Sequence, residues 1–315
     1  MGQVKEVYSQ KKCKEVTTYI SAKDKIKDPT ITEKYYDLVT DFFEYGWGKS
    51  FHFAPQTKTE KTQDAMLRYE LKMVDALKLK KGMKVLDVGC GIAGPMKNIA
   101  EKSGAEVVGL NINAYQIKKA KQYIQQSGLE KRCSFHQGSF MQVDLPDASF
   151  DAIYAIEATP HAPNKTLCFK EMYRLLKPGG CFAGYEYGLL KNYNKNNPEH
   201  VQIMEDLEHG GGLQKIPPIE EIKQAFVDAG FRVLALEDDC KKGLSWTLPL
   251  EKGIRSSKAG STMTNAFVRV LEFLRIAPKG STSVSTFLNL GADAFVEAGK
   301  RKLFTPNLFF LVQKP

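Results

Sequence analysis

The segment that most constrains the fold is 84–95, "KVLDVGCGIAGP", in which a strand-like run ends in an acid and glycines follow. Beyond it, strand and helix patterns alternate along the chain. Repeated strand–helix units with apolar strands predict an α/β fold, a mostly parallel sheet with helices on both faces. Strand-like runs occur at 84–89, 105–111, 133–140, 150–158, 181–188 and 231–237, and helical spacing at 94–104, 114–128, 164–176 and 219–230.

Segments outside these units complete the predicted architecture. The spacing of Leu67, Leu71, Val74 and Leu77 predicts one amphipathic helix before the glycines. A long helical stretch at about 255–300 precedes a β-branched and aromatic run, which we expect to return as an antiparallel seventh strand over 307–313.

Composition limits the classes of partner. The 315 residues carry a formal charge of +9, but the lysines are spread over predicted helix faces without interleaved aromatics. We therefore expect no nucleic-acid partner. The charge is best explained by solvated helix faces, with some preference for an anionic membrane surface. The six cysteines form no CxxC pair, which predicts reduced thiols and no metal site. No apolar run reaches the roughly 20 residues of a membrane-spanning helix.

The glycine segment is compatible with three kinds of ligand loop. A phosphate loop needs GK[ST] after its glycines, whereas Pro95 and Met96 stand here. "GCGIAG" matches the dinucleotide fingerprint, but that match alone is weak. Asp87 precedes the first glycine at the strand's carboxyl end, where a carboxylate suits a cationic ligand better than a pyrophosphate. A cationic amino-acid tail joined to adenosine describes S-adenosylmethionine, so we favour that cofactor, with S-adenosylhomocysteine as its product.

The remaining cofactor contacts are expected at the ends of the following strands. An amide after the second strand can bond ribose hydroxyls as donor and acceptor. A hydroxyl after the third strand can accept a bond from the adenine amino group, and an adjacent phenyl ring can stack on the base. The predicted cofactor-binding residues are Asp87, Gly89, Cys90, Gly91, Asn111, Asn113, Gln116, Gly138, Ser139, Phe140 and Glu157.

Several blocks resemble one family. The pattern at 84–95 is similar to motif one of the class I methyltransferases, and the whole set resembles the sterol 24-C-methyltransferases from about Tyr35 to Pro315. The blocks are "EYGWGKSFHF" at 44–53, "LDVGCGIAGP" at 86–95, "YAIEATPHAP" at 154–163, "LKPGG" at 176–180, "NNPEH" at 196–200 and "LRIAPKGS" at 274–281. The resemblance implies a Rossmann-like, mostly parallel seven-stranded sheet with an N-terminal aromatic cap and a C-terminal helical region.

The resemblance also implies a reaction. The 24,25 double bond of a sterol side chain attacks the methyl group of S-adenosylmethionine, a carbocation forms, a hydride shifts and a proton leaves. An alkene is a poor nucleophile, so the site must align it, exclude water and stabilise a cation, which aromatic faces do without reacting. Tyr45 and Trp47 are the expected pocket walls, because Gly46 and Gly48 permit close approach.

Three titratable residues in the motifs are catalytic candidates. Glu157 follows the fourth strand, where it can stabilise the cation or accept the final proton. His161 can partner Glu157 or hold the sterol hydroxyl, and Glu44 precedes the aromatic pair. Two alternatives stay open: Glu157 can simply cap the next helix, and His161 can be a loop residue with satisfied hydrogen bonds. Glu186 is a further carboxylate that we expect at the same edge.

Departures from the family pattern leave other functions open. Pro160 stands where the family usually has Cys, Ala93 replaces a glycine, Ala114 an acid and Tyr187 a tryptophan. Ser139 also replaces an acid. The alternatives are a methyltransferase for another lipid acceptor, such as a different sterol position or a prenylated quinol or chromanol, and a lapsed enzyme that only binds sterol.

Domains and location follow from this reading. We expect an N-terminal arm and aromatic cap at 1–60, a cofactor-binding domain at 61–239 and a sterol-methyltransferase region with the last strand at 240–315. The cap and the 240–305 insertion are expected to form a lid over the substrate. A sterol acceptor implies peripheral attachment at the cytosolic face of the endoplasmic reticulum or of a lipid droplet. The family also suggests a homo-oligomer.

Overall fold

The computed structural model describes residues 36–37, 39–41, 43–44, 47–241, 243–251, 258–276 and 281–315. The chain divides into two compact units, and each is assembled from separate stretches. We call Trp47–Leu189, Ile216–Trp246 and Thr305–Pro315 the sheet unit, and Met1–Gly46, Leu190–Lys215 and Thr247–Phe304 the helical unit. The predicted boundaries at 60 and 239 stay a prediction.

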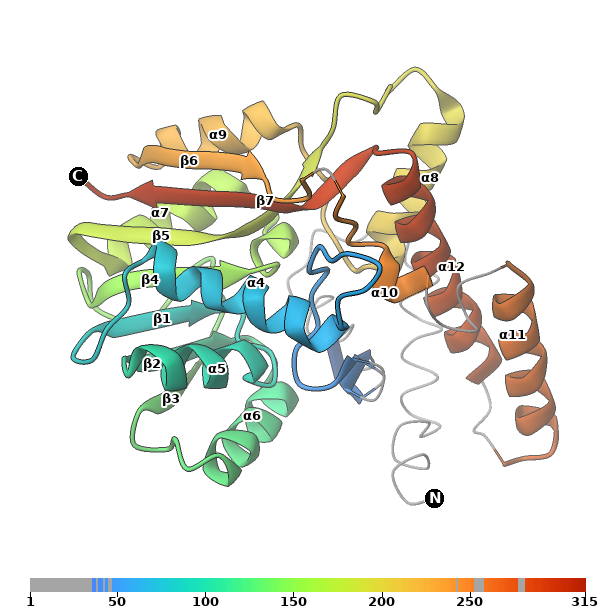
Figure 1. Cartoon of the computed structure of the whole chain (residues 1–315), viewed down its shortest axis with the longest axis horizontal. Coiled ribbons are helices and arrows are strands. Elements are labelled where there is room, and N and C mark those ends of the chain that lie inside the picture. The colour runs from blue at the N-terminus through green and yellow to red at the C-terminus, as the bar shows by residue number, and fades with distance from the viewer. Residues whose placement is uncertain are drawn as a thin grey trace. The chain divides into compact units, whose positions relative to one another are not determined.

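The sheet unit is organised around seven strands in the order β3-β2-β1-β4-β5-β7-β6 (Figure 1). Parallel pairing joins β1 to β2 and β4, β2 to β3, and β4 to β5, whereas β7 runs antiparallel to β6. The predicted parallel sheet and its antiparallel last strand are therefore confirmed. The strands are β1 (Lys84–Val88), β2 (Glu106–Asn111), β3 (Cys133–Gln137), β4 (Phe150–Ile156), β5 (Leu176–Leu189), β6 (Arg232–Asp238) and β7 (Phe304–Gln313).

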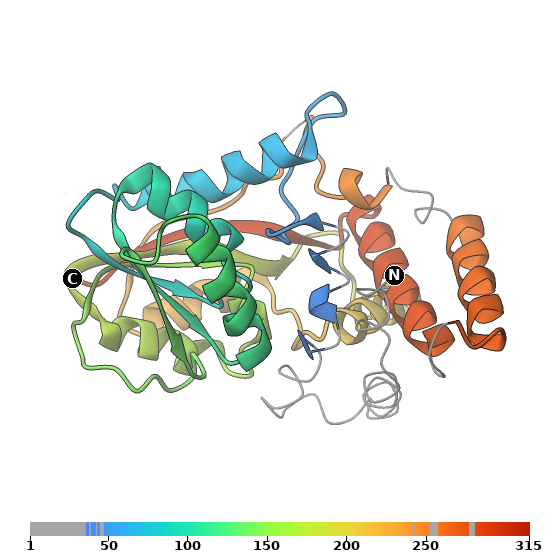
Figure 2. The same cartoon turned by 90° about the horizontal axis from the view of Figure 1, so that it is seen from below.

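Side chains alternate between the two faces of each strand, and this alternation divides the core. One face packs against α4 (Thr62–Ala76), α5 (Gly94–Ser103) and α6 (Ala114–Gln126), with Val85 and Tyr154 among its buried residues. The other face packs against α7 (Lys165–Leu175) and α9 (Ile219–Asp228), with Leu86 and Phe310 in its core (Figure 2). The predicted helices on both faces are confirmed.

The α4 helix shows where spacing of apolar residues falls short. Its existence agrees with the predicted helix, and Val74 and Leu77 are buried as expected, but Leu67 is 42% exposed and Tyr69, Glu70 and Met73 are buried as well. Leucine spacing alone does not identify the buried face, because polar side chains on that face have partners inside the molecule. This orientation brings Tyr69 against Tyr185 in β5 and Glu70 against Asn98 on α5.

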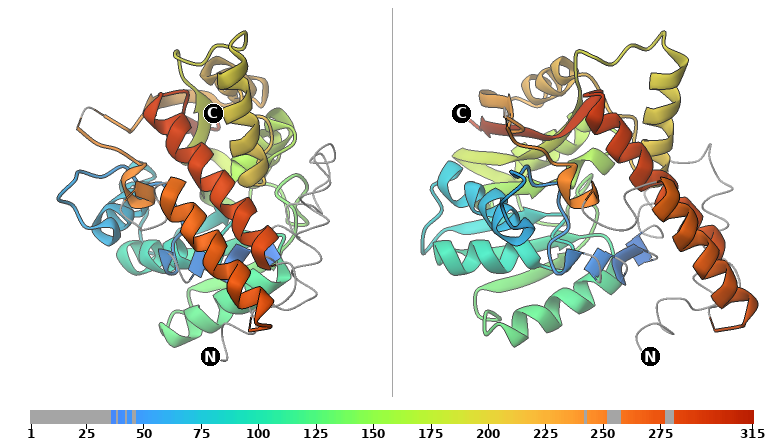
Figure 3. Two further views of the ribbon diagram at one scale, coloured as in Figure 1. Left: turned by 90° about the vertical axis from the view of Figure 1, so that its right-hand side faces the viewer. Right: turned by 45° about the vertical axis from the view of Figure 1, so that its right-hand side comes forward.

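The helical unit contains α8 (Pro198–Gly210), α10 (Leu248–Glu251), α11 (Lys258–Phe273) and α12 (Ser281–Lys300). The helix α12 contacts both α8 and α11 (Figure 3). The backbones of α8 and α12 meet at glycines, since a Cβ on Gly210 would lie 2.4 Å from the Cα of Gly291. The long helical stretch predicted at 255–300 is thus two helices, and α8 was not anticipated.

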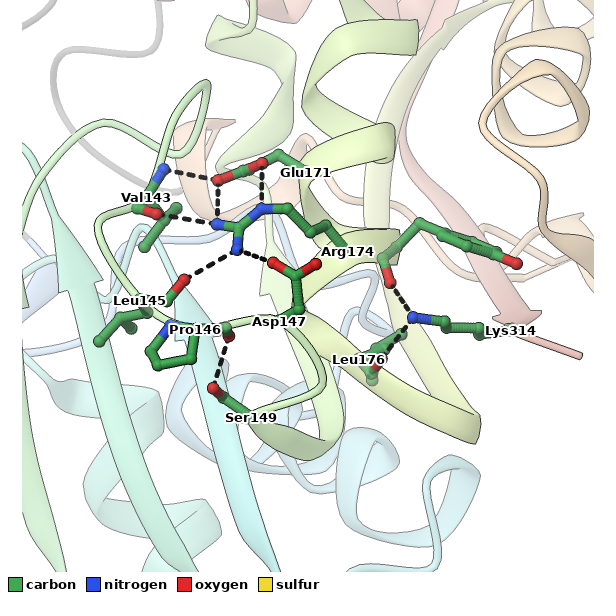
Figure 4. Close-up of polar contacts among 10 residues, drawn as sticks. Val143, Leu145, Pro146, Asp147, Ser149, Glu171, Arg174, Leu176 and Lys314 are labelled. Carbon is green, nitrogen blue, oxygen red and sulfur yellow. Dashed lines mark hydrogen bonds and ion pairs between the residues drawn. The ribbon is translucent and has the colours of Figure 1, made fainter.

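The loop between β3 and β4 is held by one arginine on α7. Arg174 donates hydrogen bonds to the carbonyl oxygens of Val143 (2.8 Å) and Leu145 (2.8 Å), and it pairs with Asp147 and Glu171 (Figure 4). Several bonds to one planar guanidinium fix the loop against the helix. The residues directly after β3, at the ligand edge, are therefore followed by a loop that Arg174 holds in place.

Candidate functional site

The candidate site lies at the carboxyl ends of β1, β2 and β4, the edge where open α/β sheets bind their ligands. Strand alternation places Asp87 on the same face as Val85, which is the face that α4 covers. Tyr154, Tyr185 and Asn307 belong to this face by the same alternation. Residues from four strands and one helix can therefore meet there.

The glycine loop has the backbone conformation that its sequence requires. Gly89 has φ +73° and Gly91 has φ +53°, values that glycine adopts without cost. The amides of Gly89 and Cys90 both donate to the Leu110 carbonyl, at 2.8 and 3.1 Å. A Cβ on Gly89 would lie 2.4 Å from the Cβ of Ala158, whereas a Cβ on Gly91 would meet no atom within 4 Å. The absence of a side chain at Gly89 thus allows close packing against Ala158, whereas Gly91 leaves open space beside the loop.

Asp87 is a buried carboxylate with an unused oxygen. It is 3% exposed, and its Oδ2 has no hydrogen-bond partner among the described residues. The pKa of Asp87 is raised to about 7, chiefly by burial; the Tyr154 hydroxyl partly opposes this shift, and the nearby Glu70 carboxylate adds to it. A cationic ligand beside Oδ2 would remove this cost, in agreement with the ligand class predicted from the sequence.

The amide predicted to hold the ribose links the loop to α6. Asn111 ends β2 and donates from Nδ2 to Gln116 Oε1 at 2.8 Å and to the Gly91 carbonyl at 3.3 Å. Asn113 caps α6, because its side chain accepts the Gln116 backbone N–H at 2.8 Å. The structure brings these residues together beside the glycine loop, and their contacts with a cofactor stay a prediction.

The residues expected at the adenine end lie next to Asn111. The amide of Gly138 donates to the Asn111 carbonyl at 3.0 Å, directly after β3. The Ser139 hydroxyl accepts the Met141 N–H at 3.2 Å, and Phe140 is partly buried against the core. Their geometry is consistent with the predicted positions, and their roles stay predictions.

Glu157 accepts three hydrogen bonds at this edge. It follows β4 in a left-handed conformation, φ +55°, which is strained for a non-glycine residue. Its Oε1 accepts the Phe53 N–H at 2.9 Å and the Tyr69 hydroxyl at 3.0 Å, and its Oε2 accepts the Tyr187 hydroxyl at 2.9 Å. Burial raises the pKa of Glu157 to about 7, although these donors partly oppose the shift. The carboxyl group is thus poised to exchange a proton near neutrality.

The helix-cap alternative for Glu157 is wrong. The next helix, α7, is capped by Asn164, whose side chain accepts the Leu167 N–H at 3.0 Å. His161 lies in a short 3₁₀ turn, Thr159–His161, where its side chain is buried. Its predicted roles, as a partner of Glu157 or as a contact for the sterol hydroxyl, stay predictions.

Tyr69 and Asn307 were missed from the sequence. Asn307 in β7 donates from Nδ2 to the Tyr69 hydroxyl at 3.2 Å and to the Phe53 carbonyl at 2.7 Å. Tyr69 also stacks on Tyr185, with ring centroids 3.7 Å apart. Asn307 thus orients the tyrosine that donates to Glu157. A polar residue within the apolar run "NLFFLV" was the signal for Asn307, whereas no motif marked Tyr69.

Aromatic rings extend from Glu157 through the cap segment. Trp47 contacts Phe51 edge-on at 5.0 Å, Phe51 contacts Phe53 at 5.6 Å, and Phe53 contacts Trp246 at 5.6 Å. Tyr187 lies 6.5 Å from Phe53. Trp47 is therefore in the aromatic series, and its role as a pocket wall stays a prediction. Tyr45 lies outside the described residues, and Glu44 belongs to the helical unit.

Glu186 connects the sheet to the segment that follows β4. It lies within β5, fully buried, where its carboxylate pairs with Lys165 at 3.2 Å and accepts the Thr159 hydroxyl at 2.7 Å. These contacts attach the 3₁₀ turn and the start of α7 to the sheet. We therefore assign Glu186 to positioning the turn that carries His161.

The comparisons with known proteins decide the family. Family models for "Methyltransferase domain" and "Sterol methyltransferase C-terminal" match residues 79–226 and 252–315. The chain is 43% identical to cycloartenol-C-24-methyltransferase 1 of Oryza sativa subsp. japonica, over 94% of this chain and 89% of that relative. It is 44% identical to cycloartenol-C-24-methyltransferase of Arabidopsis thaliana, over 90% and 87%.

The chain belongs to the sterol 24-C-methyltransferase family. Its fold is shared with mycolic acid cyclopropane synthase CmaA1, solved with SAH and CTAB, at a TM-score of 0.68 and 20% identity, covering 89% of this chain and 95% of that one. The expected class I methyltransferase fold is confirmed.

S-adenosylmethionine is the cofactor of this enzyme, and the residues present fit it. The unpaired Oδ2 of Asp87 offers an acceptor to a cationic group, and the open space at Gly91 admits a ligand against the backbone. When bound, the cofactor supplies a methyl carbon activated by a sulfonium.

The two raised pKa values predict how stability depends on pH. The pKa of Asp87 rises from 3.8 to about 7 and that of Glu157 from 4.5 to about 7, so the folded protein retains protons that the unfolded chain loses. Stability should therefore fall as pH rises from about 5 to 8, by about 5 kcal/mol if both groups ionise. Thermal melts without cofactor at these pH values test this, and the Asp87→Asn/Glu157→Gln variant should show a flatter profile. An equally steep profile in the variant would contradict the assignment.

Proposed function

We propose that this enzyme transfers a methyl group from S-adenosylmethionine to carbon 24 of a sterol side-chain double bond, as a step of sterol biosynthesis. The observation that carries the proposal is the pairing of two sites at one sheet edge. Asp87 and the glycine loop form a cofactor site, and Glu157 stands beside aromatic rings at the end of the neighbouring strand β4. A poorly nucleophilic, apolar acceptor requires this combination.

The reaction balances without a metal or a redox partner. The π electrons of the 24,25 double bond form the new bond to the methyl carbon, while the electrons of the broken carbon–sulfur bond remain on sulfur. A cation is left at carbon 25, and the hydride on carbon 24 shifts to it. Loss of a proton from the added carbon then gives a 24-methylene side chain.

The chain's residues contribute to two of these stages. The faces of Phe53, Trp47 and Trp246 stabilise a carbocation without capturing it. The Glu157 carboxylate stabilises the same charge and then accepts the departing proton. Three hydrogen-bond donors hold that carboxylate in place, and its pKa of about 7 lets it act as a base at neutral pH.

Product analysis tests the proposed function. The purified enzyme is incubated with labelled S-adenosylmethionine and either zymosterol, desmosterol or cycloartenol, and the products are identified by mass spectrometry. The same incubation with prenylated quinol and chromanol acceptors is the comparison. Label at carbon 24 of a sterol supports the proposal. Label in the quinol or chromanol alone, or in no acceptor, would contradict it.

We further propose that the enzyme attaches peripherally to the endoplasmic reticulum or to lipid droplets. A sterol is delivered from a membrane, and α11 has an outward face suited to one. Phe267, Val270 and Phe273 are 63%, 53% and 85% exposed, and the cations Arg269 and Arg275 are exposed beside them. The one acid between residues 258 and 276, Glu272, accepts hydrogen bonds from Thr282 on α12 instead. Apolar side chains with flanking cations are typical of interfacial helices.

None of the helices in the described ranges is long and apolar enough to cross a membrane. Self-association stays an expectation from the family, and gel filtration coupled to light scattering tests it.

Substitution of the exposed phenylalanines tests the membrane surface. Phe267→Ser/Phe273→Ser should bind vesicles of phosphatidylcholine with 30% phosphatidylserine about tenfold or more weakly, because two large apolar groups no longer enter the interface. Sedimentation with vesicles measures this. Leu167→Ser, on α7 and 54% exposed, is the control and should bind like the unchanged enzyme. Equal binding by all three proteins would contradict the proposal for α11.

A further inference from the structure

Glu70 is a fully buried carboxylate that the proposed reaction does not use. It lies on α4 with no exposed surface, and its Oε2 accepts a hydrogen bond from Asn98 Nδ2 on α5 at 2.7 Å. Its Oε1 is buried and has no hydrogen-bond partner within the ranges that the structure describes. Burial raises the pKa of Glu70, although Ser50 and Asn98 partly offset this. A carboxylate buried at such cost needs a compensating group.

The position of Glu70 connects it to the cofactor loop. Asn98 lies on α5 one turn after Gly94, the residue at which the glycine loop becomes helix. Ser50, which lowers the pKa of Glu70, also packs over that residue, since a Cβ on Gly94 would lie 2.5 Å from Ser50 Oγ. Glu70 therefore lies beside the first turn of α5.

Glu70 also lies close to Asp87. Asp87 lies on the sheet face that α4 covers, Glu70 is buried on α4, and the charge of Glu70 contributes to the raised pKa of Asp87. Each has one oxygen without a hydrogen bond, and neither forms an ion pair with a lysine or arginine in the described chain. Two neighbouring buried carboxylates repel each other unless a cation is added.

The missing group must both carry positive charge and donate hydrogen bonds. The two atoms without hydrogen bonds are Glu70 Oε1 and Asp87 Oδ2. When these carboxylates are ionised, they can accept hydrogen bonds but cannot donate them. S-adenosylmethionine has two positively charged groups, the sulfonium and the amino-acid ammonium. The sulfonium has no N–H or O–H and cannot donate a hydrogen bond. The amino-acid ammonium has three N–H donors, so it matches two carboxylate oxygens and leaves one donor for a backbone carbonyl.

We propose that Glu70 and Asp87 together bind the α-ammonium group of the cofactor's amino-acid tail. This rests on the cofactor assigned in the proposed function and adds a binding residue outside the glycine motif. Charge-assisted hydrogen bonds to buried carboxylates select the intact amino-acid tail over adenosine thioethers that lack it. Because S-adenosylhomocysteine keeps the same ammonium, the reaction product is held by the same pair.

Binding calorimetry of the Glu70→Gln variant separates this role from a structural one. Glutamine keeps the size of the side chain and removes its charge, so affinity for S-adenosylhomocysteine should fall about 10- to 100-fold. Affinity for 5′-methylthioadenosine, which has the adenosine and sulfur but no ammonium, should not change. Glu101→Gln removes an exposed carboxylate from α5 and is the matched control, expected to bind both ligands normally.

The outcomes are distinguishable. Unchanged affinity of Glu70→Gln for S-adenosylhomocysteine, or an equal loss for both ligands, would overturn the ammonium assignment. Failure of the unchanged enzyme to bind S-adenosylhomocysteine would instead overturn the cofactor site itself. Thermal melts establish that the variant is folded. If Glu70→Gln does not fold, Glu70→Asp keeps the charge and should show an intermediate, ammonium-dependent loss, whereas normal affinity in Glu70→Asp would count against the proposal.

Discussion

Replacement of Glu157 by glutamine should lower kcat for sterol methylation by about 10²- to 10⁴-fold, the range expected for loss of a general base. The amide cannot accept the proton that leaves the methylated sterol, and it carries no charge to stabilise the cation. Binding of S-adenosylhomocysteine should weaken far less than kcat falls, because the Asp87 oxygen and the glycine loop are intact even though Glu157 is itself a predicted cofactor contact. Single-turnover methylation of zymosterol and calorimetry of the cofactor product measure the two effects separately.

The pH profile of the unchanged enzyme gives an independent check on Glu157. Its ionised form is the active one, so kcat should rise with pH through a pKa of about 7 and level off above it. Tyr187→Phe is the companion variant, because it removes one donor that lowers the pKa of Glu157. Its profile should move toward higher pH while the plateau is largely kept. A flat profile in both enzymes, or activity of Glu157→Gln near that of the unchanged enzyme, would show that another group takes the proton.

The sheet was predictable because its strands are short, apolar and separated by regular helices. Val85, Leu86 and Val88 in β1 are all buried, as a central parallel strand requires. The same logic identified the ligand edge, since Asp87, Asn111 and Glu157 each stand at or next to a strand's carboxyl end. Whether a residue stands at the end of a strand depends only on its neighbours in the chain, so the sequence alone was enough to predict it.

The polar partners at the site were not predictable in the same way. Glu157 receives hydrogen bonds from Phe53, Tyr69 and Tyr187, which lie 104, 88 and 30 positions away in the chain. The burial of Tyr69 and Glu70 on α4 was missed for a related reason. Tyr69 and Glu70 look suited to solvent, and only their partners Asn307 and Asn98 make burial favourable. Such pairs join side chains from different elements, so no local pattern in the sequence displays them.

A pair of glycine substitutions in one loop should separate folding from cofactor binding. Gly89→Ala combines φ +73° with a Cβ 2.4 Å from Ala158 Cβ, so we expect a loss of about 2–4 kcal/mol in stability together with loss of cofactor binding. Gly91→Ala meets no protein atom within 4 Å, so only the strain of φ +53° remains, about 1–2 kcal/mol. Its affinity for S-adenosylhomocysteine should nevertheless fall more than tenfold, because the methyl group occupies space that the loop keeps for the ligand.

Gly128→Ala is the matched control for Gly91→Ala. Gly128 has φ +68°, and a Cβ added there would meet no atom within 4 Å, but it follows the far end of α6 and is remote from the loop. Thermal melts should therefore show a similar small loss of stability for both variants, while calorimetry shows weakened binding only for Gly91→Ala. Equal affinity in the two variants would mean that the space beside Gly91 is not where the cofactor lies. The contrast works because both residues have similar backbone strain, so any difference in binding reports the ligand and not the fold.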